Sequence, residues 1–369
     1  MRIPYKSLTF WIFVGLFGGM ICGRAFGESI VPVAQPLSDV FLRLLRMAIM
    51  PLIITSLTAA VIVVGGRKNL EILGVKTFAY YITSSLMAIL TGQILVNIFE
   101  PGIGSAIRLE ETVTQVPAAQ QSFTDLILTF KTHLGDFFQA AFQAMMKMTR
   151  FVIWSAPLGV FGINAVIVAT TGFEAFRSLG FYFGIVLIGL FIHAVITLPL
   201  LVYLVTRKNP FRHYKGMPPA LVTAFSTCST IVTLPLTMEA VTDNSKVSEK
   251  ISSFVLPIGA TVNMDGTALY ECVAVIFIAQ VYGIALSLDQ QLVVVFTALL
   301  ASIGAASVPM SGLVMMSIIL AAVGLPLEGV AIILAVDRVL DMFRTTVNVL
   351  SDSCGAVIVA KLDGEDVLT

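Results

Sequence analysis

The sequence predicts an all-α polytopic membrane protein with two re-entrant helical hairpins and an inverted repeat. Three observations lead there: the composition, the lengths of the apolar stretches, and two apolar segments divided by polar tips. Of the 369 residues, 57% are hydrophobic and 12% are charged, whereas soluble domains carry about 25% charged residues. With so few charges, most of the outer surface must face hydrocarbon.

Simple membrane-spanning helices are the first elements. About 20 apolar residues in a helix cross the ~30 Å hydrocarbon core of a bilayer. Such stretches fall near residues 8–30, 40–65, 74–99, 151–171, 179–206, 252–284 and 330–360. No small-residue cleavage site follows Arg2 and Lys6, so we interpret the first stretch as a membrane helix and not as a signal peptide. Glycines at four-residue spacing in it predict a close helix contact: Gly15, Gly19 and Gly23.

The basic residues predict the orientation, because cytoplasmic ends of membrane helices are enriched in Lys and Arg. The clusters are Arg2/Lys6, Arg67/Lys68/Lys76, Lys147/Arg150, Arg207/Lys208/Arg212/Lys215 and Lys246/Lys250. This orientation requires one more crossing between residues 100 and 147, where the sequence contains no uninterrupted apolar span. A shortened or irregular segment is therefore expected there.

The charges and the cysteines exclude other classes of protein. Lys and Arg balance Asp and Glu at 22 each, so the chain has no basic footprint for nucleic acid. The four cysteines include no CxxC pair and the three histidines do not cluster. Disulfides, zinc and haem therefore have no support.

Two apolar segments are unsuited to simple spanning. Residues 217–242 and 288–323 each consist of two apolar arms around a polar tip. An arm of about 11 residues reaches only ~17 Å, so both segments predict re-entrant hairpins whose tips lie inside protein or against water. Each is followed by a long helix with a polar interruption, and by charge the two enter from opposite sides. Secondary transporters use such inverted repeats to bracket substrate and ion sites.

The last helix carries a one-sided polar stripe within AVDRVLDMFRTTVNVLSDS. At 100° per residue the polar side chains fall within an arc of about 100°: Asp337, Asp341, Arg344, Thr345, Asn348 and Asp352. Ionised groups inside a membrane cost at least ~2.5 kcal/mol each and mark functional sites. The alternative is an ion-pair stripe that holds helices together. Three carboxylates facing one arginine, however, leave a negative surplus that suits cations or an ammonium group.

A second polar group lies in the helix after the first hairpin. Asn263 and Asp265 would point in opposite directions on a regular helix, but Gly266 and the polar run around it indicate that the helix unwinds here. Freed carbonyls, an amide oxygen and a carboxylate form the all-oxygen environment that hard cations prefer. The alternative is a break that only kinks the helix.

Two further candidates are weaker on spacing alone. Tyr81, Ser84 and Ser85 share one face of the third helix, although hydroxyls in membrane helices usually bond their own backbone. Glu271 lies in an apolar helix with no basic neighbour in sequence. It is a candidate proton carrier or, equally, a neutral hydrogen-bonding structural group.

Together, NMDGTALYE, SIGAASVP and DRVLDMFRTTVNVLSDS resemble the glutamate transporter family of dicarboxylate/amino acid:cation symporters, which includes the excitatory amino acid transporters. The resemblance is strong over residues 217–361 and extends towards the N-terminus through FLRLLRMAIMPLI, YYITSS and SAPLGVF. It implies eight membrane helices plus two hairpins, a homotrimeric scaffold, and a transport domain that moves as an elevator, with the hairpin tips as gates. Localisation in the cell membrane follows from this resemblance.

The resemblance also implies a division of the chain. Scaffold helices 1 and 2 would occupy residues 1–73 and transport-domain helix 3 residues 74–100. An extracellular loop with a shortened helix 4 would occupy 101–146, and helices 5 and 6 would occupy 147–215. The core of the transport domain, with both hairpins, broken helix 7 and helix 8, would occupy 216–369.

For the substrate, the resemblance implies L-aspartate or L-glutamate. Arg344 would pair with the side-chain carboxylate, Asp341 would hold the amino group, and Asn348 would contact the α-carboxylate. A guanidinium fork suits a carboxylate on chemical grounds as well. The rest of the pocket would be Thr267, Thr345, Thr230 and the backbone around Cys228 and Val308.

For the coupling ions, the resemblance implies sodium, with protons as a further coupling ion. The side-chain ligands of sodium would be Asp352, Asn263, Asp265, Tyr81, Ser84 and Ser85. The carbonyl ligands would be those of Gly259, Thr261, Asn348, Ser302, Ile303 and Ala305. Glu271 matches the glutamate of proton-coupled members.

Several residues depart from the family pattern. Members commonly carry a second arginine at the first hairpin tip or in the last helix, where this chain has Cys228 and Met342. Arg338, one turn from Asp341, is a candidate substitute. Ile231 and Ser307 stand where a serine and a glycine are expected.

The leading hypothesis is a sodium-coupled symporter of acidic amino acids. The alternatives are an anion-conducting member of the family and a symporter of neutral amino acids or dicarboxylates. An intramembrane aspartyl protease using Asp265 and Asp341 is disfavoured, because no GxGD sequence is present and Arg344 lies one turn from Asp341. We therefore expect no enzymatic activity.

Overall fold

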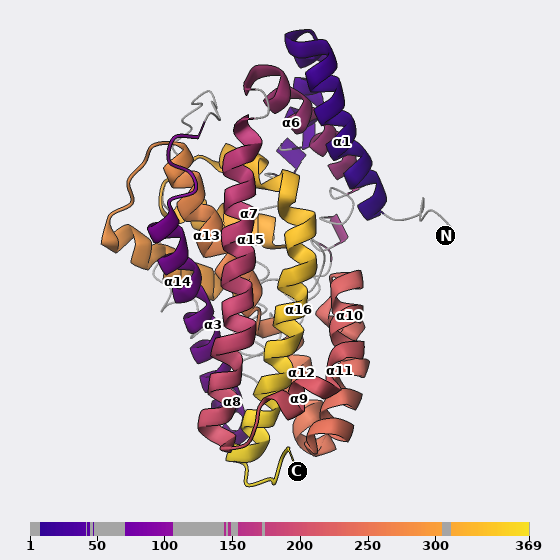
Figure 1. Cartoon of the computed structure of the whole chain (residues 1–369), viewed down its shortest axis with the longest axis vertical. Coiled ribbons are helices and arrows are strands. Elements are labelled where there is room, and N and C mark those ends of the chain that lie inside the picture. The colour runs from indigo at the N-terminus through magenta and orange to yellow at the C-terminus, as the bar shows by residue number, and fades with distance from the viewer. Residues whose placement is uncertain are drawn as a thin grey trace.

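The computed structural model describes residues 8–41, 43–44, 47, 71–105, 144, 147–148, 154–171, 174–304 and 311–368. Within these ranges every regular element is a helix, which confirms the predicted all-α class (Figure 1). Three stretches are long and apolar enough to cross a membrane: Ile72–Phe99, Arg177–Thr206 and Glu249–Val281. They agree with the spans predicted near 74–99, 179–206 and 252–284.

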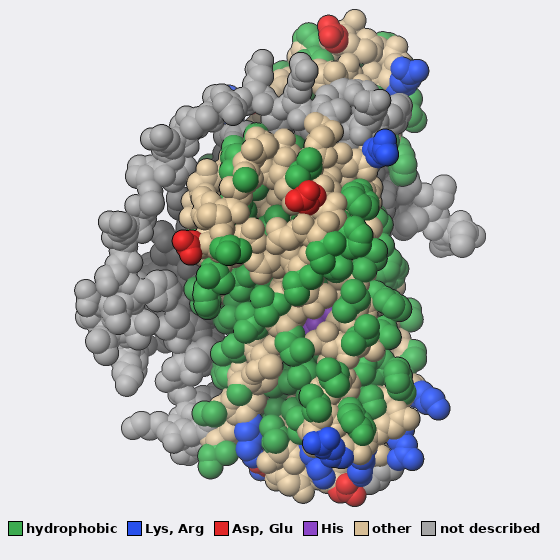
Figure 2. Space-filling model, turned by 60° about the vertical axis from the view of Figure 1, so that its left-hand side comes forward, with side chains coloured by type: hydrophobic (Ala, Val, Ile, Leu, Met, Phe, Trp, Pro, Cys, Tyr) green, Lys and Arg blue, Asp and Glu red, His purple; other side chains and the backbone are tan. Residues whose placement is uncertain are grey.

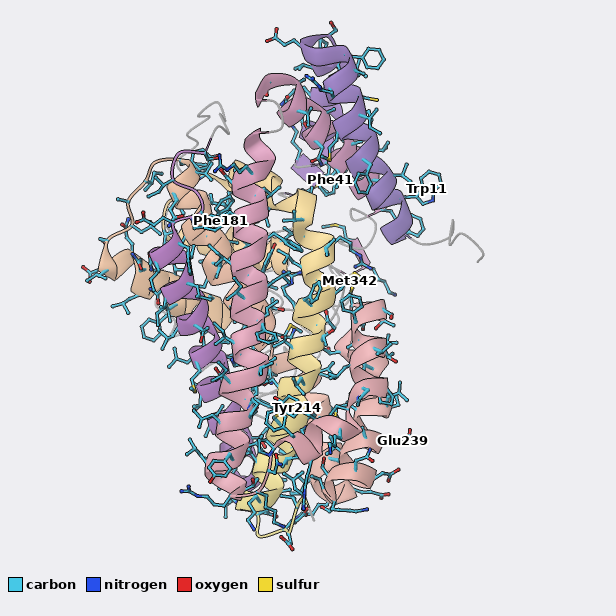
Figure 3. The ribbon with its side chains drawn as sticks, viewed as in Figure 1. Trp11, Phe41, Phe181, Tyr214, Glu239 and Met342 are labelled. Atoms are coloured by element: carbon cyan, nitrogen blue, oxygen red, sulfur yellow. The ribbon has the colours of Figure 1, made fainter. Side chains whose placement is uncertain are left out.

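The N-terminal part pairs two helices. Helix α1 (Leu8–Phe26) continues through η1 (Gly27–Ile30) into helical residues 31–41, and it packs against α6 (Ala156–Thr171) at one end of the molecule (Figure 1). Gly15, Gly19 and Gly23 face carbonyl groups of α6 so closely that a Cβ would collide with them. This confirms the contact predicted from the glycine spacing. Phe41 packs on Gly159 of α6, while Trp11 points outward (Figure 3).

The first hairpin is confirmed, with one correction to its size. Helix α10 (Pro218–Thr227) turns at Cys228, whose φ of 51° is left-handed, into α11 (Thr230–Ser245), which Ser229 caps. The second arm has 16 residues and not the predicted 11 or so. Pro235 is the sixth residue of α11, and the helix continues through it.

The second hairpin consists of α14 (Leu288–Gly304) and α15 (Ser311–Ala322), and its tip at 305–310 lies outside the described residues. Its first arm, with 17 residues, is again longer than predicted. The long helix after the first hairpin is divided, as expected, into α12 (Glu249–Val262) and α13 (Asp265–Val281). The remaining elements are α3 (Glu71–Phe99), α7 (Glu174–Ile192), the π-helical turn η3 (His193–Thr197), α8 (Leu198–Thr206), α9 (Phe211–Gly216), η4 (Leu327–Gly329) and α16 (Val330–Leu362).

Helix α13 is the centre of the fold. It is buried throughout Asp265–Ala279 and packs against α3, α7, α14, α15 and α16. The apolar interior forms two clusters, one around α13 and one around α12 and the last turns of α16. Along each helix they meet at a polar residue: Ser84 and Ser85 on α3, Asn263 between α12 and α13, and Asn348 on α16.

The outer surface carries a broad apolar band, and Lys and Arg gather at one end (Figure 2). Exposed apolar side chains of the band include Ile82, Leu90, Ile94, Ile188 and Phe191. The end with Lys76, Lys208, Arg212 and Lys250, near the C-terminus, is called the basic end below. A hydrocarbon-facing band next to a basic end is typical of a membrane protein.

The C-terminal segment 363–368 is fastened across the basic end. Lys76 and Lys250 bind Asp363 at 3.0 and 3.4 Å, and Lys208 binds Asp366 at 2.5 Å. The Leu368 N–H donates to the Ser245 carbonyl at 3.0 Å. The segment therefore ties α16 to the base of the first hairpin and to α3.

Beneath this segment, His213 of α9 connects two serines. Its Nδ1 lies 2.7 Å from the Ser245 hydroxyl and its Nε2 lies 2.8 Å from the Ser353 hydroxyl. Burial lowers the pKa of His213 to about 4, because desolvation disfavours the charged ring. The neutral ring thus joins α9, α11 and α16.

Candidate functional site

The break between α12 and α13 positions the first polar centre. Asn263 is extended, with φ −97° and ψ 93°, and α13 restarts at Asp265. The Gly266 N–H donates to Oδ1 of Asn348 at 2.8 Å, so α16 satisfies one of the first amides of α13. The break brings the side chains of Asn263 and Asp265 to one cluster, which a continuous helix would not do.

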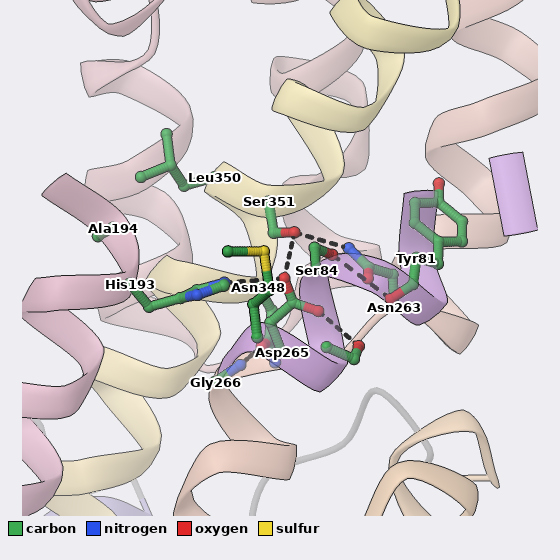
Figure 4. A network of polar contacts seen from close by, with 12 residues as sticks. Tyr81, Ser84, His193, Ala194, Asn263, Asp265, Gly266, Asn348, Leu350 and Ser351 are labelled. Atoms are coloured by element: carbon green, nitrogen blue, oxygen red, sulfur yellow. Dashed lines mark hydrogen bonds and ion pairs between the residues drawn. The ribbon is translucent and has the colours of Figure 1, made fainter. Parts of the chain in front are cut away.

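Asp265 receives hydrogen bonds from two hydroxyls (Figure 4). Ser85 of α3 donates to Oδ1 and Ser351 of α16 donates to Oδ2, each at 2.6 Å. Nε2 of His193 lies 3.0 Å from Oδ2. Asp265 is completely buried, so three elements hold its carboxylate in place.

Asn263 links this carboxylate to a second one. Its Nδ2 donates to Oδ1 of Asp352 at 2.9 Å and to Oγ of Ser351 at 3.0 Å. Its Oδ1 is buried and has no hydrogen-bond partner among the described residues. The residues Ser85, Asn263, Asp265, Ser351 and Asp352 are called the carboxylate centre below.

The carboxylate centre has the chemistry of a cation site. Within the described ranges neither Asp265 nor Asp352 forms an ion pair with Lys or Arg. A buried charge is expensive unless it is paired or bound to a metal. Carboxylate, amide and hydroxyl oxygens are the ligands of hard cations, and Asn263 holds one oxygen free. The residues present therefore fit a monovalent cation.

Of the other predicted cation ligands, Gly259 lies beside the carboxylate centre, whereas the hydroxyls of Tyr81 and Ser84 bond backbone carbonyls. Gly259 is so close that a Cβ would be 2.6 Å from both Asp352 Oδ1 and the Tyr81 hydroxyl. Tyr81 donates to the Val255 carbonyl at 2.8 Å. The Ser84 hydroxyl donates to the Tyr81 carbonyl at 3.4 Å. It therefore bonds the backbone of its own helix, as hydroxyls in membrane helices usually do.

The remaining predicted ligands approach from α12 and the second hairpin. The Thr261 hydroxyl bonds carbonyls of its own helix. Ser302 is buried at the end of α14 and its hydroxyl bonds the Leu299 carbonyl, while Ile303 packs on the apolar cluster around α12. Ala305 lies outside the described residues, as does Val308 of the predicted substrate pocket.

A second polar centre lies two turns away on α16. Arg344 is 1% exposed, and its Nη2 lies 2.9 Å from Asp341 Oδ1 and 3.3 Å from Asp337 Oδ1. Its Cζ is 3.8 Å from the centroid of the Tyr270 ring, whose hydroxyl donates to Asp337 at 2.7 Å. Asp337, Asp341, Arg344 and Tyr270 are called the arginine centre below.

Two donor groups of the Arg344 guanidinium are free for a ligand. Within the described structure its Nε and Nη1 have no hydrogen-bond partner. A Cβ on Gly312, at the start of α15, would be 2.7 Å from Nη1, so Nη1 faces the second hairpin. A guanidinium with two free donors is suited to a carboxylate.

The structure places the other substrate candidates around these two centres. Asn348 donates from Nδ2 to the Thr267 hydroxyl at 3.2 Å and so lies between the centres. Thr345 is 5% exposed beside Arg344. Thr230 donates to the Ala260 carbonyl at 2.7 Å, which ties the first hairpin to α12. Cys228 forms the turn next to it.

Two residues of the site escaped sequence reasoning. His193 occupies the π-helical turn η3, and such turns are frequent at functional sites. Ser351 interrupts an apolar run directly before Asp352, and that position on the polar stripe was the available signal. A lone histidine in an apolar helix gives no comparable signal.

Two hairpins, a buried helix broken at Asn263, a polar centre at this break and a second one two turns along α16 define a secondary transporter of the helical, inverted-repeat class. The chain belongs to the sodium:dicarboxylate symporter family, whose model matches residues 8–133 and 129–362. The family and its members are transporters, so the expectation of no enzymatic activity is confirmed and the protease alternative is wrong.

The curated relatives are excitatory amino acid transporters. Human excitatory amino acid transporter 3 is 36% identical over 414 residues, covering 89% of this chain and 79% of the relative. Human excitatory amino acid transporter 2 is 34% identical over 460 residues, covering 98% and 80%. The mouse transporter 3 match reaches 50% identity over 234 residues, 63% of this chain but only 45% of that relative. The two longer alignments exceed the 369 residues of this chain, so those relatives contain residues with no counterpart here.

Proposed function

We propose that the protein is a sodium-coupled symporter of acidic amino acids, L-aspartate or L-glutamate, in the cell membrane. One observation carries the proposal: a buried arginine with two free guanidinium donors lies two turns of α16 from a pair of buried carboxylates, Asp352 of α16 and Asp265 of α13, that have no Lys or Arg partner among the described residues. Arg344 would bind the side-chain carboxylate of the substrate, and Asp341 its ammonium group. The carboxylate centre would bind sodium.

The arrangement supports coupling between the two ligands. Asn348 touches Gly266 and Thr267 of α13 and lies between the two centres. A cation that neutralises Asp265 and Asp352 would fix the break between α12 and α13, and with it Asn348 and Thr267. Substrate affinity would therefore depend on sodium.

Uptake into proteoliposomes tests this function. Labelled L-aspartate and L-glutamate are offered under an inward sodium gradient, with choline in place of sodium as the ion control. We expect sodium-dependent accumulation that Arg344→Ala abolishes and that Arg177→Ala, an exposed arginine on α7, leaves unchanged. Accumulation that persists in choline, or in Arg344→Ala, would contradict the proposal.

Protons are the proposed second coupling ion, carried by Glu271. This residue is completely buried, and neither carboxyl oxygen has a hydrogen-bond partner in the described part of the chain. The alternative structural role would require such partners. Glu271→Gln should remove the dependence of uptake on external pH, whereas Glu239→Gln on the surface-facing part of α11 should retain it (Figure 3).

A dicarboxylate without an amino group is the second candidate substrate, and Arg338 favours it. Nη1 of Arg338 lies 3.4 Å from Asp341 Oδ2, while Arg344 occupies Oδ1. Both oxygens of the ammonium-binding carboxylate thus have basic partners. Succinate that competes with L-aspartate at equal concentration would support this candidate. Succinate that fails to compete would support an acidic amino acid as the substrate.

The remaining expectations from the family stand as proposals: a homotrimer, an elevator movement of residues 74–100 and 216–369, scaffold helices 1 and 2 in 1–73, and helices 5 and 6 in 147–215. The shortened segment 101–146 lies largely outside the described residues. Cross-linking of the purified protein would distinguish a trimer from a monomer.

A further inference from the structure

Ser351 links several parts of the carboxylate centre. It is completely buried on α16, and its hydroxyl contacts both Asp265, at 2.6 Å, and Asn263, at 3.0 Å (Figure 4). Tyr80 of α3 donates to the Ser351 carbonyl at 3.1 Å. Side chains of α3, of α13 and of the break before α13 therefore contact one serine.

The next serine on the same helix behaves differently. The Ser353 hydroxyl donates to the Leu350 carbonyl of its own helix at 2.7 Å, as hydroxyls in membrane helices usually do. Ser351 instead donates across the interface to α13. A serine in a helix usually bonds a carbonyl of its own helix. The hydrogen bond from Ser351 to Asp265 departs from this pattern, so a role of Ser351 in the carboxylate centre would explain it.

The remaining hydrogen-bonding capacity of Ser351 points to a cation. A serine hydroxyl has one donor and two lone pairs. The donor goes to Asp265 and one lone pair accepts from Asn263. The Tyr80 hydroxyl also lies 3.3 Å from this oxygen, but its single proton goes to the Ser351 carbonyl at 3.1 Å, which leaves the second lone pair of Ser351 for a ligand. Oδ1 of Asn263, buried and without a partner among the described residues, is a second available oxygen. Both belong to the cluster of the two carboxylates, Asp265 and Asp352, that have no Lys or Arg partner among the described residues.

We infer that the Ser351 hydroxyl is a further oxygen ligand of the coupling cation, in addition to the residues expected from sequence. The inference rests on the proposed sodium coupling. The hydroxyl keeps its hydrogen bond to Asp265 when the cation binds and offers its free lone pair to the ion. Because Ser351 precedes Asp352, one turn of α16 contributes two ligands, and cation binding draws α16 and α13 together.

Sodium binding can be measured without transport. The purified protein is heated in detergent, without amino acid, while sodium chloride replaces choline chloride at constant ionic strength. The readout is the sodium concentration that gives half of the maximal rise in melting temperature. Ser351→Ala and Ser351→Gly remove the hydroxyl, Asp265→Asn serves as the reference for loss of the centre, and Ser317→Ala is the matched control. Ser317 is also buried, but its hydroxyl bonds only its own helix.

We expect Ser351→Ala to raise the half-saturating sodium concentration about tenfold, the effect of losing one partner of a buried charged group. Ser317→Ala should match the wild type. The melting temperature in choline reports folding, and Ser351→Gly replaces Ser351→Ala if the alanine variant does not fold. A Ser351 variant that folds and retains the wild-type sodium response would overturn the inference while leaving the proposed function intact. A wild-type protein that sodium does not stabilise would overturn both.

Discussion

The two polar centres of α16 differ in whether an arginine accompanies their carboxylates. The arginine centre holds a buried guanidinium between Asp337 and Asp341, and two of its donor groups have no partner among the described residues. The carboxylate centre holds Asp265 and Asp352 among hydroxyl and amide groups, with no Lys or Arg bound to either in the described ranges. Under the proposed function, the same helix would present one centre to an anionic group of the substrate and another, two turns on, to a cation.

The difference teaches how one helix separates two ligands. Arg344 and Asp352 are eight residues apart, about 12 Å along the helix axis. Asn348 lies between them and bonds both Gly266 and Thr267. Variants that damage only one centre can therefore test whether the two ligands bind independently or through Asn348.

The largest expected effect is that of Arg344→Lys on the arginine centre. Lysine keeps the charge but cannot offer two parallel donors to a carboxylate, so uptake of L-aspartate should fall about 100-fold. The sodium concentration that half-stabilises the protein in the absence of substrate should stay the same. Arg177→Lys is the control. If Arg344→Lys also abolished the stabilisation by sodium, the two centres would not bind their ligands separately.

Gly259→Ala is the matching change at the carboxylate centre. The new Cβ would lie 2.6 Å from Asp352 Oδ1 and from the Tyr81 hydroxyl, so both must move. Overpacking of this kind costs about 1–3 kcal/mol, and half-saturating sodium should rise about tenfold. Gly74→Ala, where a Cβ meets nothing within 4 Å, is the control. An unchanged sodium titration would remove Asp352 from the cation site.

Arg338→Gln sharpens the assignment within the arginine centre. The guanidinium is partly exposed and its 3.4 Å contact with Asp341 is long, so the expected effect is modest. Freed from this partner, Asp341 should bind an ammonium group about threefold more tightly. Competition between L-aspartate and succinate measures the change: the affinity for L-aspartate should increase and the affinity for succinate should not. Equal shifts for both would mean that Arg338 does not act through Asp341.

The smallest expected effect concerns the attachment of α16 at the basic end. Hydrogen bonds and charge from Lys76 and Lys250 hold the pKa of Asp363 below its ordinary value, and Lys208 lowers the pKa of Asp366 in the same way. Because both pKa values are lower in the folded protein, these carboxylates stabilise the attached segment above their ordinary pKa near 4. The stabilisation is lost as the pH falls through the folded-state pKa values.

Hydrogen exchange of residues 363–368 measures this. Corrected for the intrinsic pH dependence of exchange, protection should decrease below about pH 4. The double variant Asp363→Asn/Asp366→Asn should show reduced protection already at neutral pH and little further change on acidification. Unaltered protection in that variant would contradict the prediction. It would show that the buried side chains of Val367 and Leu368 are sufficient to hold the segment in place.

Much of the architecture could be predicted from the sequence because it depends on apolar length and on interruptions in it. The glycine contact of α1, the turn at Cys228 and the break at Asn263 follow from local patterns. The predicted lengths of the hairpin arms were wrong: α11 has 16 residues and continues through Pro235, and α14 has 17 residues. The polar stripe of α16 was predicted from its period, and the structure places most of its members at the two centres.

The partners of these residues were harder to predict because they depend on packing between distant segments. Ser85, Asp265 and Ser351 come from three helices, and no spacing rule relates such helices. His193 reaches Asp265 from a π-helical turn that nothing in the sequence marks. Ser84 shows the converse, since its face was predicted but its hydroxyl bonds its own backbone.

Helix α13 has a consequence for biosynthesis. Its residues Asp265–Ala279 are all buried within the protein, yet they include Asp265 and Glu271, which are costly in lipid without protein partners. Part of that protein environment is α16, which follows α13 in the chain and is synthesised after it. During translation α13 therefore cannot settle into its final surroundings until residues up to about 362 have left the ribosome. A chain that stops before α16 would leave two acidic groups facing lipid or the insertion machinery, a defect that membrane quality control can recognise.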